Sequence, residues 1–373
     1  MTKPENNQIS TIESIPGYSN LDRWNKGVSS ACERLNSGVV IPEWTPSFKV
    51  SPDANVFAIG SCFARNIERE LQHLEVNVTS ANPLSDVLEV RTNLQLGLLN
   101  KYNPISIHQE LAWAADEGSF PSNGFIDCQG KLYDPYLREQ TPGGDLEKMQ
   151  VRRHALKEYF AQIYEADLVI VTLGLTETWF DRSTKLAITE VPSPRLMKLH
   201  PQRFGFKQLY HSDCIKVLKS ICALLKKHGK PNHKIIFTVS PVALKRTFSG
   251  QDVVVANMMS KSTLRSAAGE IAAHIEEVDY FPSYEAVMMS DPLLVWQEDL
   301  RNVTEFIVNQ IMNEFVQRYG LKAPQTKEQI QSNYHFLLQR RLALSKKNAN
   351  LLGNILSEHS QQNPNLDFHK FGT

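Results

Sequence analysis

Short, continuous runs of apolar residues, each followed by a helical pattern, constrain the fold of this chain more than any other feature. Three such runs lie at 55–60, 167–174 and 234–240, and a weaker run follows at 274–281. Uninterrupted runs of this length are typical of strands buried on both faces of a sheet. Because the strands alternate with helices, we expect an α/β fold with a mostly parallel sheet covered on both faces.

The helices expected between these strands show apolar residues at spacings of three and four. Phe63, Ile67, Leu71 and Leu74 give this pattern directly after the first strand. Further helices are expected near 106–116, 150–165, 209–228, 259–273 and 303–318. Parallel sheets bind ligands beyond the carboxyl ends of their strands, so functional residues are sought there.

The pattern divides the chain into an arm, a main domain and an extension. Residues 1–50 are rich in Pro, Ser and Asn and are expected to form an extended arm lying on the domain. Residues 51–320 form the α/β domain, in which 80–150 is a loop-rich insertion, either functional or mobile. Residues 321–373 are expected to be a helical extension and tail. The apolar stripe of 326–358 would pack on the domain or make a subunit contact.

Composition narrows the classes of function. The chain has 40 basic and 40 acidic residues, so its formal net charge of zero gives no indication of a nucleic-acid partner. The polar start shows no signal segment, and no apolar run approaches the ~18 residues that span a bilayer, so we expect a cytoplasmic protein. The five scattered cysteines, the spacing of the histidines and the lack of a Gly-rich phosphate loop indicate neither a metal nor a nucleotide cofactor.

Ser61 is the first candidate for chemistry. It lies between the first strand and the first helix of the domain, where Gly60 permits a sharp turn. We expect an exposed hydroxyl, which suits a nucleophile, and backbone N–H groups that point into the crevice and stabilise an oxyanion. A Ser at this position is also a common helix N-cap, and both interpretations stay open.

The residues around Ser61 resemble a known family. Gly60-Ser61-Cys62-Phe63-Ala64 spells the motif that names the GSCFA family. Further blocks in the family's order span about 55–320, at 173–179, 238–242 with 246–248, 260–265 and 280–285. The family is similar to the SGNH/GDSL hydrolase superfamily. The resemblance therefore implies acyl chemistry on a flavodoxin-like three-layer α/β/α sandwich.

The resemblance implies a catalytic triad in which Ser61 attacks an acyl carbonyl and Asp299 orients a base three positions further on. Residues 299–304 keep the D-x-x-H-V-T spacing, but Asn302 stands in the place of His. Asn cannot accept a proton near neutral pH, and it is also a routine helix N-cap. Three explanations stay open: a substitution introduced to trap substrate, a natural enzyme with another base, or a pseudoenzyme.

The resemblance also implies an oxyanion hole. Backbone N–H groups beside Gly60 and Cys62 would contribute to it. Residues 174–177 correspond to the superfamily's G-x-N-D, so Thr176 or the main chain at Gly174 would replace the usual Asn, with Glu177 beside it. Asn103 lies in the loop that would supply a second donor, although an ordinary turn Asn before Pro is the alternative.

Another base could come from His200, which lies beyond the second strand. His108 and His154, in or beside the insertion, are further candidates. A lone surface His is more often incidental.

Charged and aromatic residues could bind the substrate. Lys261 and Arg265, one helical turn apart, could hold a carboxylate or phosphate together with Arg246. Salt bridging to Glu285 is the alternative. Trp179 and Tyr284 could stack on a sugar face, whereas core packing is the alternative for both aromatic rings.

These observations predict an SGNH-like serine esterase or O-acyltransferase acting on a carbohydrate or glycan precursor. Hydrolysis needs no cofactor, whereas transfer requires an acyl donor such as acetyl-coenzyme A and a site that excludes water. The alternatives are a catalytically dead module that binds a glycan or a protein partner, and an interaction protein assembled through 326–358. If the enzyme prediction holds, Ser61, Asp299 and Asn302 meet in one crevice at the carboxyl end of the sheet.

Overall fold

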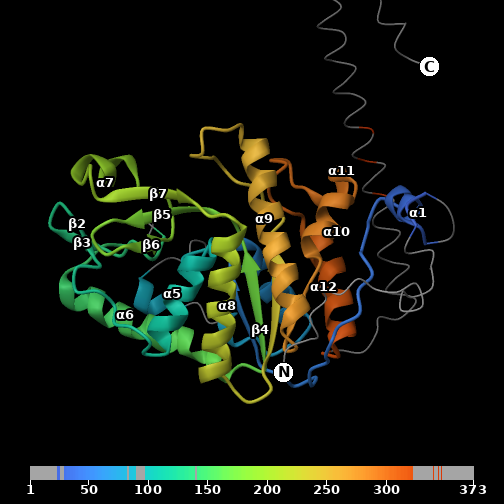
Figure 1. Cartoon of the computed structure of the whole chain (residues 1–373), viewed down its shortest axis with the longest axis horizontal. Helices are drawn as coiled ribbons and strands as arrows, with labels where there is room; N and C mark the ends of the chain where they lie inside the picture. The colour runs from blue at the N-terminus through green and yellow to red at the C-terminus, as the bar shows by residue number, and fades with distance from the viewer. Residues whose placement is uncertain are drawn as a thin grey trace, which may run out of the picture.

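The computed structural model describes residues 23–25, 29–81, 84–89, 97–138 and 141–321, and the single positions 339, 343 and 346. Its centre is a parallel sheet of β1 (Val56–Gly60), β4 (Leu168–Leu173), β8 (Lys234–Val239) and β9 (Val278–Tyr280), in that order, and β4 is labelled near the middle of Figure 1. All four strands were predicted from the apolar runs. A parallel bridge from Val56 to Val78 adds a short contact outside β1, which gives the flavodoxin-like order 2-1-3-4-5.

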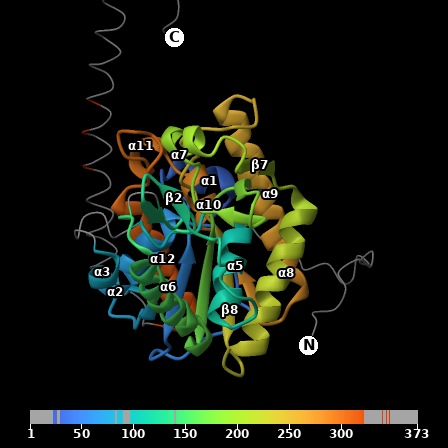
Figure 2. The same cartoon turned by 90° about the vertical axis from the view of Figure 1, so that its left-hand side faces the viewer.

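Helices cover both faces of this sheet, so the predicted three-layer α/β/α sandwich is confirmed (Figures 1 and 2). Phe57 and Ile59 point to one face and Val56 and Ala58 to the other, as the alternation of side chains along a strand requires. The first face carries α5 (Pro104–Ala114), α6 (Leu146–Ala161), α8 (His211–His228) and α9 (Val253–His274). The second carries α2 (Cys62–His73), α10 (Ser283–Met289), α11 (Pro292–Val295) and α12 (Glu305–Tyr319).

Two small antiparallel sheets, which the sequence did not predict, lie beyond the carboxyl end of β4 (Figure 1). One contains β5 (Glu177–Asp181), β6 (Leu186–Ile188) and β7 (Phe204–Gln208), and the other is the hairpin of β2 (Ile126–Cys128) and β3 (Lys131–Tyr133). The helix α7 (Pro194–Leu199) joins β6 to β7. These elements form a wall beside the edge at which ligands of parallel sheets bind.

The described part of the insertion is held to the domain by buried charges. Lys101 donates to Glu110 of α5 at 2.6 Å, and Arg153 of α6 donates to the same carboxylate at 3.1 Å. Arg153 also forms a two-pronged ion pair with Asp134, and its guanidinium lies 4.6 Å from the ring centroid of Phe120. Among the described residues, the short helices η3 (Thr79–Ala81) and α3 (Ser85–Leu88) lie at the start of the insertion, and η4 (Gln162–Glu165) follows α6.

The described part of the N-terminal arm contains α1 (Ala31–Asn36) and then extended chain. Ser47 donates to Asp279 of β9 through its amide (2.9 Å) and its hydroxyl (2.6 Å), and the ring of Trp44 packs edge-on against Phe281 at 5.3 Å. The arm thus continues the second helical layer past the edge strand. The helix predicted at 326–358 lies outside the described residues apart from three single positions. None of the described helices combines the length and the apolar character that crossing a bilayer requires.

Candidate functional site

Ser61 lies at the turn from β1 into α2, as the sequence predicted. Gly60 has φ +136°, and a Cβ there would lie 2.1 Å from the carbonyl oxygen of Thr172, so only Gly fits this turn. The Ser61 Oγ accepts the amide N–H of Phe63 at 3.3 Å, which is the expected N-cap bond. The side chain is 2% exposed, so the expected exposed hydroxyl is corrected to one buried beneath neighbouring loops.

Gly174, directly after β4, faces Ser61 across the end of the sheet. A Cβ at Gly174 would lie 3.0 Å from the Cβ of Ser61 and 2.6 Å from the carbonyl oxygen of Tyr102. That same Tyr102 oxygen accepts the amides of Gly174 (3.1 Å) and Leu175 (2.8 Å). A glycine is therefore needed where three segments of backbone converge.

The backbone amides that the sequence suggested for an oxyanion hole already donate hydrogen bonds to other residues. The Ser61 N–H donates to Thr172 (3.1 Å) and the Gly174 N–H donates to Tyr102, because both amides continue the backbone pairing at the sheet edge. The amide of Cys62 has no backbone partner among the described residues and bonds to its own thiol. Burial raises the pKa of the Cys62 thiol, and Arg301, Lys261 and Arg138 oppose that shift.

Asn103 is the N-cap of α5 and is 1% exposed. Its Oδ1 accepts the amide N–H of Ser106 at 2.8 Å, and Pro104 occupies the first helical turn, so the turn interpretation describes its backbone. The Nδ2 group has no hydrogen-bond partner within the described part of the chain. Because Asn103 follows Tyr102, which bonds to Gly174, this amide group lies at the same end of the sheet as Ser61.

Thr176 and Glu177 hold neighbouring loops. The amide and the hydroxyl of Thr176 both bond to the Ser260 hydroxyl of α9, at 2.8 and 3.1 Å. The Glu177 carboxylate accepts the Thr247 hydroxyl and, at 2.9 Å, the Phe248 amide. Both side chains therefore fix the walls of the site.

Lys261 reaches the edge of the sheet from α9. It is 1% exposed, and its Nζ donates to the carbonyl oxygens of Gly174 at 2.6 Å and Val242 at 2.8 Å. No carboxylate contacts it among the described residues. Burial lowers the pKa of Lys261 to about 7, with a smaller contribution in the same direction from Arg301. The signal for this burial is in the sequence, because Lys261 precedes Leu264 by three positions and Ala268 by seven.

Asp299 and Asn302 contact each other in the turn before α12. The Asn302 Nδ2 donates to Asp299 Oδ2 at 2.5 Å, and the Asn302 and Arg301 amides donate to Oδ1 at 2.9 and 3.0 Å. These backbone bonds hold the pKa of Asp299 below its usual range. The charge of Arg301 acts on both Cys62 and Lys261, which places the turn at the same end of the sheet. That Asn302 itself reaches Ser61 stays a prediction.

The other candidates lie apart from Ser61 or have partners of their own. The His200 Nε2 lies 2.7 Å from the carbonyl oxygen of Asp127 in β2, and His154 pairs with Glu158 on the exposed face of α6. Arg265 forms an ion pair with Glu285, which was the alternative to substrate binding. His108 is half-buried in α5, Arg246 is exposed, and Tyr284 donates to the Met258 sulfur at 3.8 Å.

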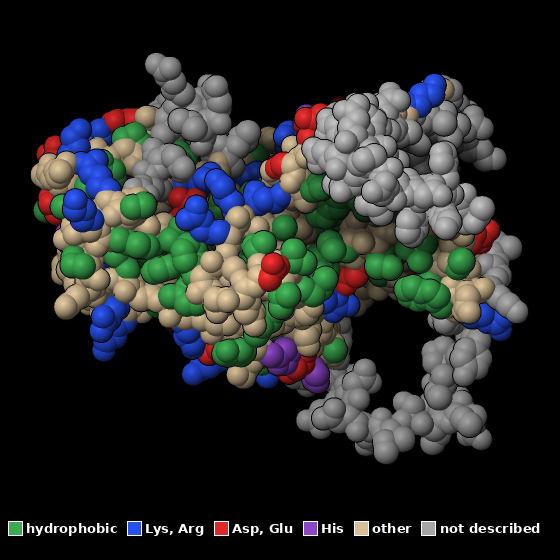
Figure 3. Space-filling model, turned by 90° about the horizontal axis from the view of Figure 1, so that it is seen from above, with side chains coloured by type: hydrophobic (Ala, Val, Ile, Leu, Met, Phe, Trp, Pro, Cys, Tyr) green, Lys and Arg blue, Asp and Glu red, His purple; other side chains and the backbone are tan. Residues whose placement is uncertain are grey.

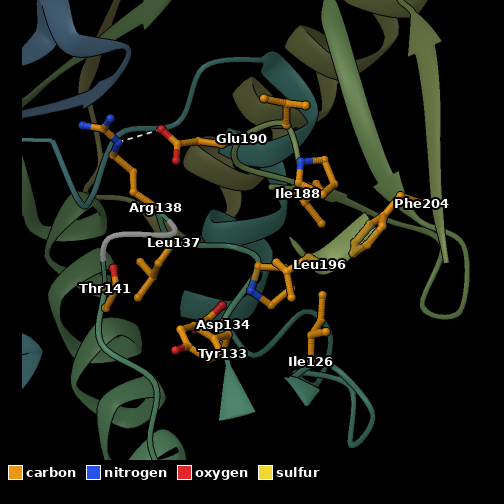
Figure 4. A pocket seen from close by; sticks show the side chains of 13 residues that line it. Ile126, Tyr133, Asp134, Leu137, Arg138, Thr141, Ile188, Glu190, Leu196 and Phe204 are labelled. Carbon is orange, nitrogen blue, oxygen red and sulfur yellow. Dashed lines mark hydrogen bonds and ion pairs between the residues drawn. The ribbon is translucent and has the colours of Figure 1, made fainter. Parts of the chain in front are cut away.

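A groove beside the site was not anticipated from the sequence. It is a shallow groove, partly open to solvent, between the β2–β3 hairpin and the β5–β6–β7 sheet (Figure 4). Its walls are apolar, with Ile126, Ile188, Leu196 and Phe204 among the lining residues. The ion pair of Arg138 and Glu190 (2.7 Å) lies at its rim. Lys and Arg side chains also gather near the middle of the face above the strand ends (Figure 3).

The fold and this geometry define a class of α/β/α sandwich proteins, in which the candidate site surrounds a serine between the first strand and its helix. Within that class the chain belongs to the GSCFA family, whose family model matches residues 55–315. No curated protein and no solved structure matches the chain. The described residues contain no group of His, Cys, Asp and Glu side chains that could hold a metal ion.

Proposed function

We propose that the chain is a serine-dependent esterase or O-acyltransferase of the SGNH type, with Ser61 as its nucleophile. The observation that carries this proposal is the position of Ser61 at the start of α2, at the end of the sheet where the Asn103 Nδ2 has no hydrogen-bond partner among the described residues. A second donor is the Cys62 amide, which has no backbone partner in the described chain and bonds only to its own thiol. Two such donors at a helix N-terminus would stabilise the negative oxygen that forms when a serine attacks an acyl carbonyl.

The proposed acyl acceptor is a carbohydrate or glycan precursor in the cytoplasm. Support comes from the aromatic group beside the 240–250 loop, where Trp179 and Phe248 pack edge-on at 5.1 Å and Phe248 is 37% exposed. Arg246 in the same loop is exposed and could bind an anionic group. Transfer would need an acyl donor such as acetyl-coenzyme A, whereas hydrolysis would need only water.

A second candidate function is a binding module that has lost its chemistry. It is favoured by the contact between Asn302 and Asp299, because an Asn is held where the triad needs a base. In this case the pocket would bind an ester or glycan without turnover.

Labelling with a fluorophosphonate tests both candidates without knowledge of the substrate. The reagent forms an O–P bond with an activated serine and releases fluoride, and the labelled residue is found by peptide mass spectrometry. We expect labelling at Ser61 in the native chain and none in Ser61→Ala. Ser193→Ala is the matched control, because Ser193 also caps a helix and accepts an amide at 3.3 Å, so its loss should not reduce labelling.

The outcomes separate the candidates. If the native chain is inert and Asn302→His becomes labelled at Ser61, the binding module is supported. If neither protein is labelled at Ser61 while both remain folded, the serine chemistry is wrong and Ser61 is only a helix cap.

A further inference from the structure

The proposed serine chemistry needs a group that accepts the proton of Ser61, and the triad position does not supply one. Asn302 has no basic nitrogen, and its side chain is bonded to Asp299. Two of the histidines considered as substitutes, His200 and His154, bond elsewhere. Among the described residues, a buried amine without a carboxylate partner reaches this end of the sheet from α9.

We propose that Lys261 is the proton acceptor for Ser61, directly or through one water molecule. The inference rests on the proposed serine chemistry, and it names the base of that same site. Gly174 links the two residues: a Cβ built on it would lie 3.0 Å from the Ser61 Cβ, and its carbonyl oxygen accepts a hydrogen bond from the Lys261 Nζ at 2.6 Å. Ser61 and Lys261 are therefore both neighbours of the same glycine.

The two carbonyl bonds also orient the amine for this role. A neutral lysine nitrogen has two hydrogens and one lone pair, and Gly174 and Val242 supply two acceptors, at 2.6 and 2.8 Å. When both hydrogens are so used, the lone pair occupies the remaining tetrahedral position. Among the described residues, Nζ has no third hydrogen-bond partner, so the proposal assigns its lone pair to the proton of Ser61.

The surroundings favour the neutral amine near pH 7. Burial lowers the pKa of Lys261 to about 7, and no carboxylate lies against it in the described structure. The charged or titratable groups that act on it are Cys62 at the start of α2, which raises its pKa, and Arg301 in the 297–302 turn, which lowers it. A base whose pKa lies near the operating pH is the most effective.

The step balances as follows. The Lys261 lone pair takes the Ser61 Oγ proton as Oγ bonds to the acyl carbon and the carbonyl electron pair moves to oxygen. When the carbon–oxygen bond to the leaving group breaks, the ammonium returns the proton to that oxygen. In the second half, Lys261 takes a proton from water or an acceptor hydroxyl as that oxygen bonds to the acyl carbon. The carbonyl then re-forms, the bond from the acyl carbon to Ser61 Oγ breaks, and the ammonium returns the proton to Oγ.

The test measures the rate of fluorophosphonate labelling at Ser61 against pH. In the native chain the rate should rise through an inflection near pH 7. Lys261→Arg keeps a positive charge and hydrogen-bond donors but cannot be deprotonated, so it should lose the inflection and react at least ~100-fold more slowly. Lys261→Met should behave in the same way, and circular dichroism verifies that both variants fold.

A second variant leaves Lys261 in place. Arg301→Gln removes a cation that lowers the pKa of Lys261, so the inflection should move to higher pH. Arg69→Gln is the matched control, since it removes the same charge from the exposed side of α2 and should not move the inflection.

The outcomes distinguish this inference from the function on which it rests. Absence of labelling at Ser61 in the native chain overturns the serine chemistry itself. Labelling of the native chain with an unchanged rate and pH profile in Lys261→Arg and Lys261→Met shows that Lys261 only clamps the two carbonyls. An inflection that stays fixed in Arg301→Gln also counts against Lys261 as the base.

Discussion

At the scale of single residues, the identity of the hydrogen-bond donors around Ser61 is the main result. The sequence indicated the amides of Ser61 and Gly174, but both continue the backbone pairing at the ends of β1 and β4. This pairing joins segments far apart in the chain, so no local pattern could show that the two amides are occupied. Among the described residues, the candidates that remain are the Cys62 amide, which bonds only to its own thiol, and the Asn103 side-chain amide.

Asn103 should therefore matter to the rate more than to the fold. We expect Asn103→Ser to keep an oxygen that caps α5, because Ser is a good N-cap, but to lose the reach of Nδ2. If Nδ2 stabilises an oxyanion, hydrolysis of an activated ester should fall by about 10²–10³-fold with little change in stability. Asp145→Ser, which changes the N-cap of α6, is the control. An unchanged rate in Asn103→Ser would restrict this residue to capping.

The burial of Lys261 also makes stability depend on pH. Its pKa is about 7 in the folded chain and near the ordinary value of 10.5 in the unfolded chain. Between these values the unfolded state binds more protons, so the free energy of unfolding rises with pH, by at most about 1.4 kcal/mol per pH unit. Urea titrations should show that the free energy of unfolding of the native chain rises relative to that of Lys261→Met from pH 7 to 10.5. A constant difference over this range would contradict the lowered pKa.

At the scale of secondary-structure elements, burial decides what the sequence could predict. The four strands of the central sheet and the helices α2, α5, α6, α8, α9 and α12 carry continuous or periodic apolar residues, and all were predicted. The strands β5, β6 and β7 are three to five residues long and partly exposed, so their apolar pattern is too brief to identify. Their pairing across long gaps stabilises them, and no local signal encodes it.

The charges between α5 and α6 are expected to dominate the stability of the insertion. Arg153→Met leaves the carboxylates of Glu110 and Asp134 buried without their shared partner, although Lys101 still contacts Glu110. Breaking a buried ion pair in this way costs about 3–5 kcal/mol in the free energy of unfolding. Lys157→Met on the same helix breaks only an exposed pair with Asp116 and should cost less than about 1 kcal/mol. Equal urea midpoints for the two variants would rule out this stabilising role of the buried Arg153 ion pairs.

At the scale of the whole molecule, the described part of the arm packs on the domain. The described arm contacts β9 and α12 through polar and aromatic groups, including the guanidinium of Arg318, 4.5 Å from the ring centroid of Trp44. Composition predicted an arm on the domain, but it could not identify these contacts. Which residues the arm contacts depends on which edge of the sheet it lies against.

Trp44 tests the contribution of the arm. We expect Trp44→Ala to lower the free energy of unfolding by about 2–4 kcal/mol, because it removes the contacts with Phe281 and Arg318. Trp24→Ala is the control, since Trp24 is 64% exposed and its loss should change stability by less than about 0.5 kcal/mol. Thermal unfolding of the two variants gives the comparison. Similar melting temperatures would mean that the arm only rests on the surface.

The register of β1 on β4 has a kinetic consequence. Val56 pairs with Leu168, so the whole insertion lies between two strands that must meet before the central sheet exists. Closing such a long loop lowers the entropy of the chain before native contacts offset that loss. Folds dominated by distant contacts therefore form slowly. Ser61 meets Gly174 only through this pairing, so the site cannot form on a partly folded first half. A refolding chain should therefore regain helical signal well before the proposed labelling at Ser61 appears.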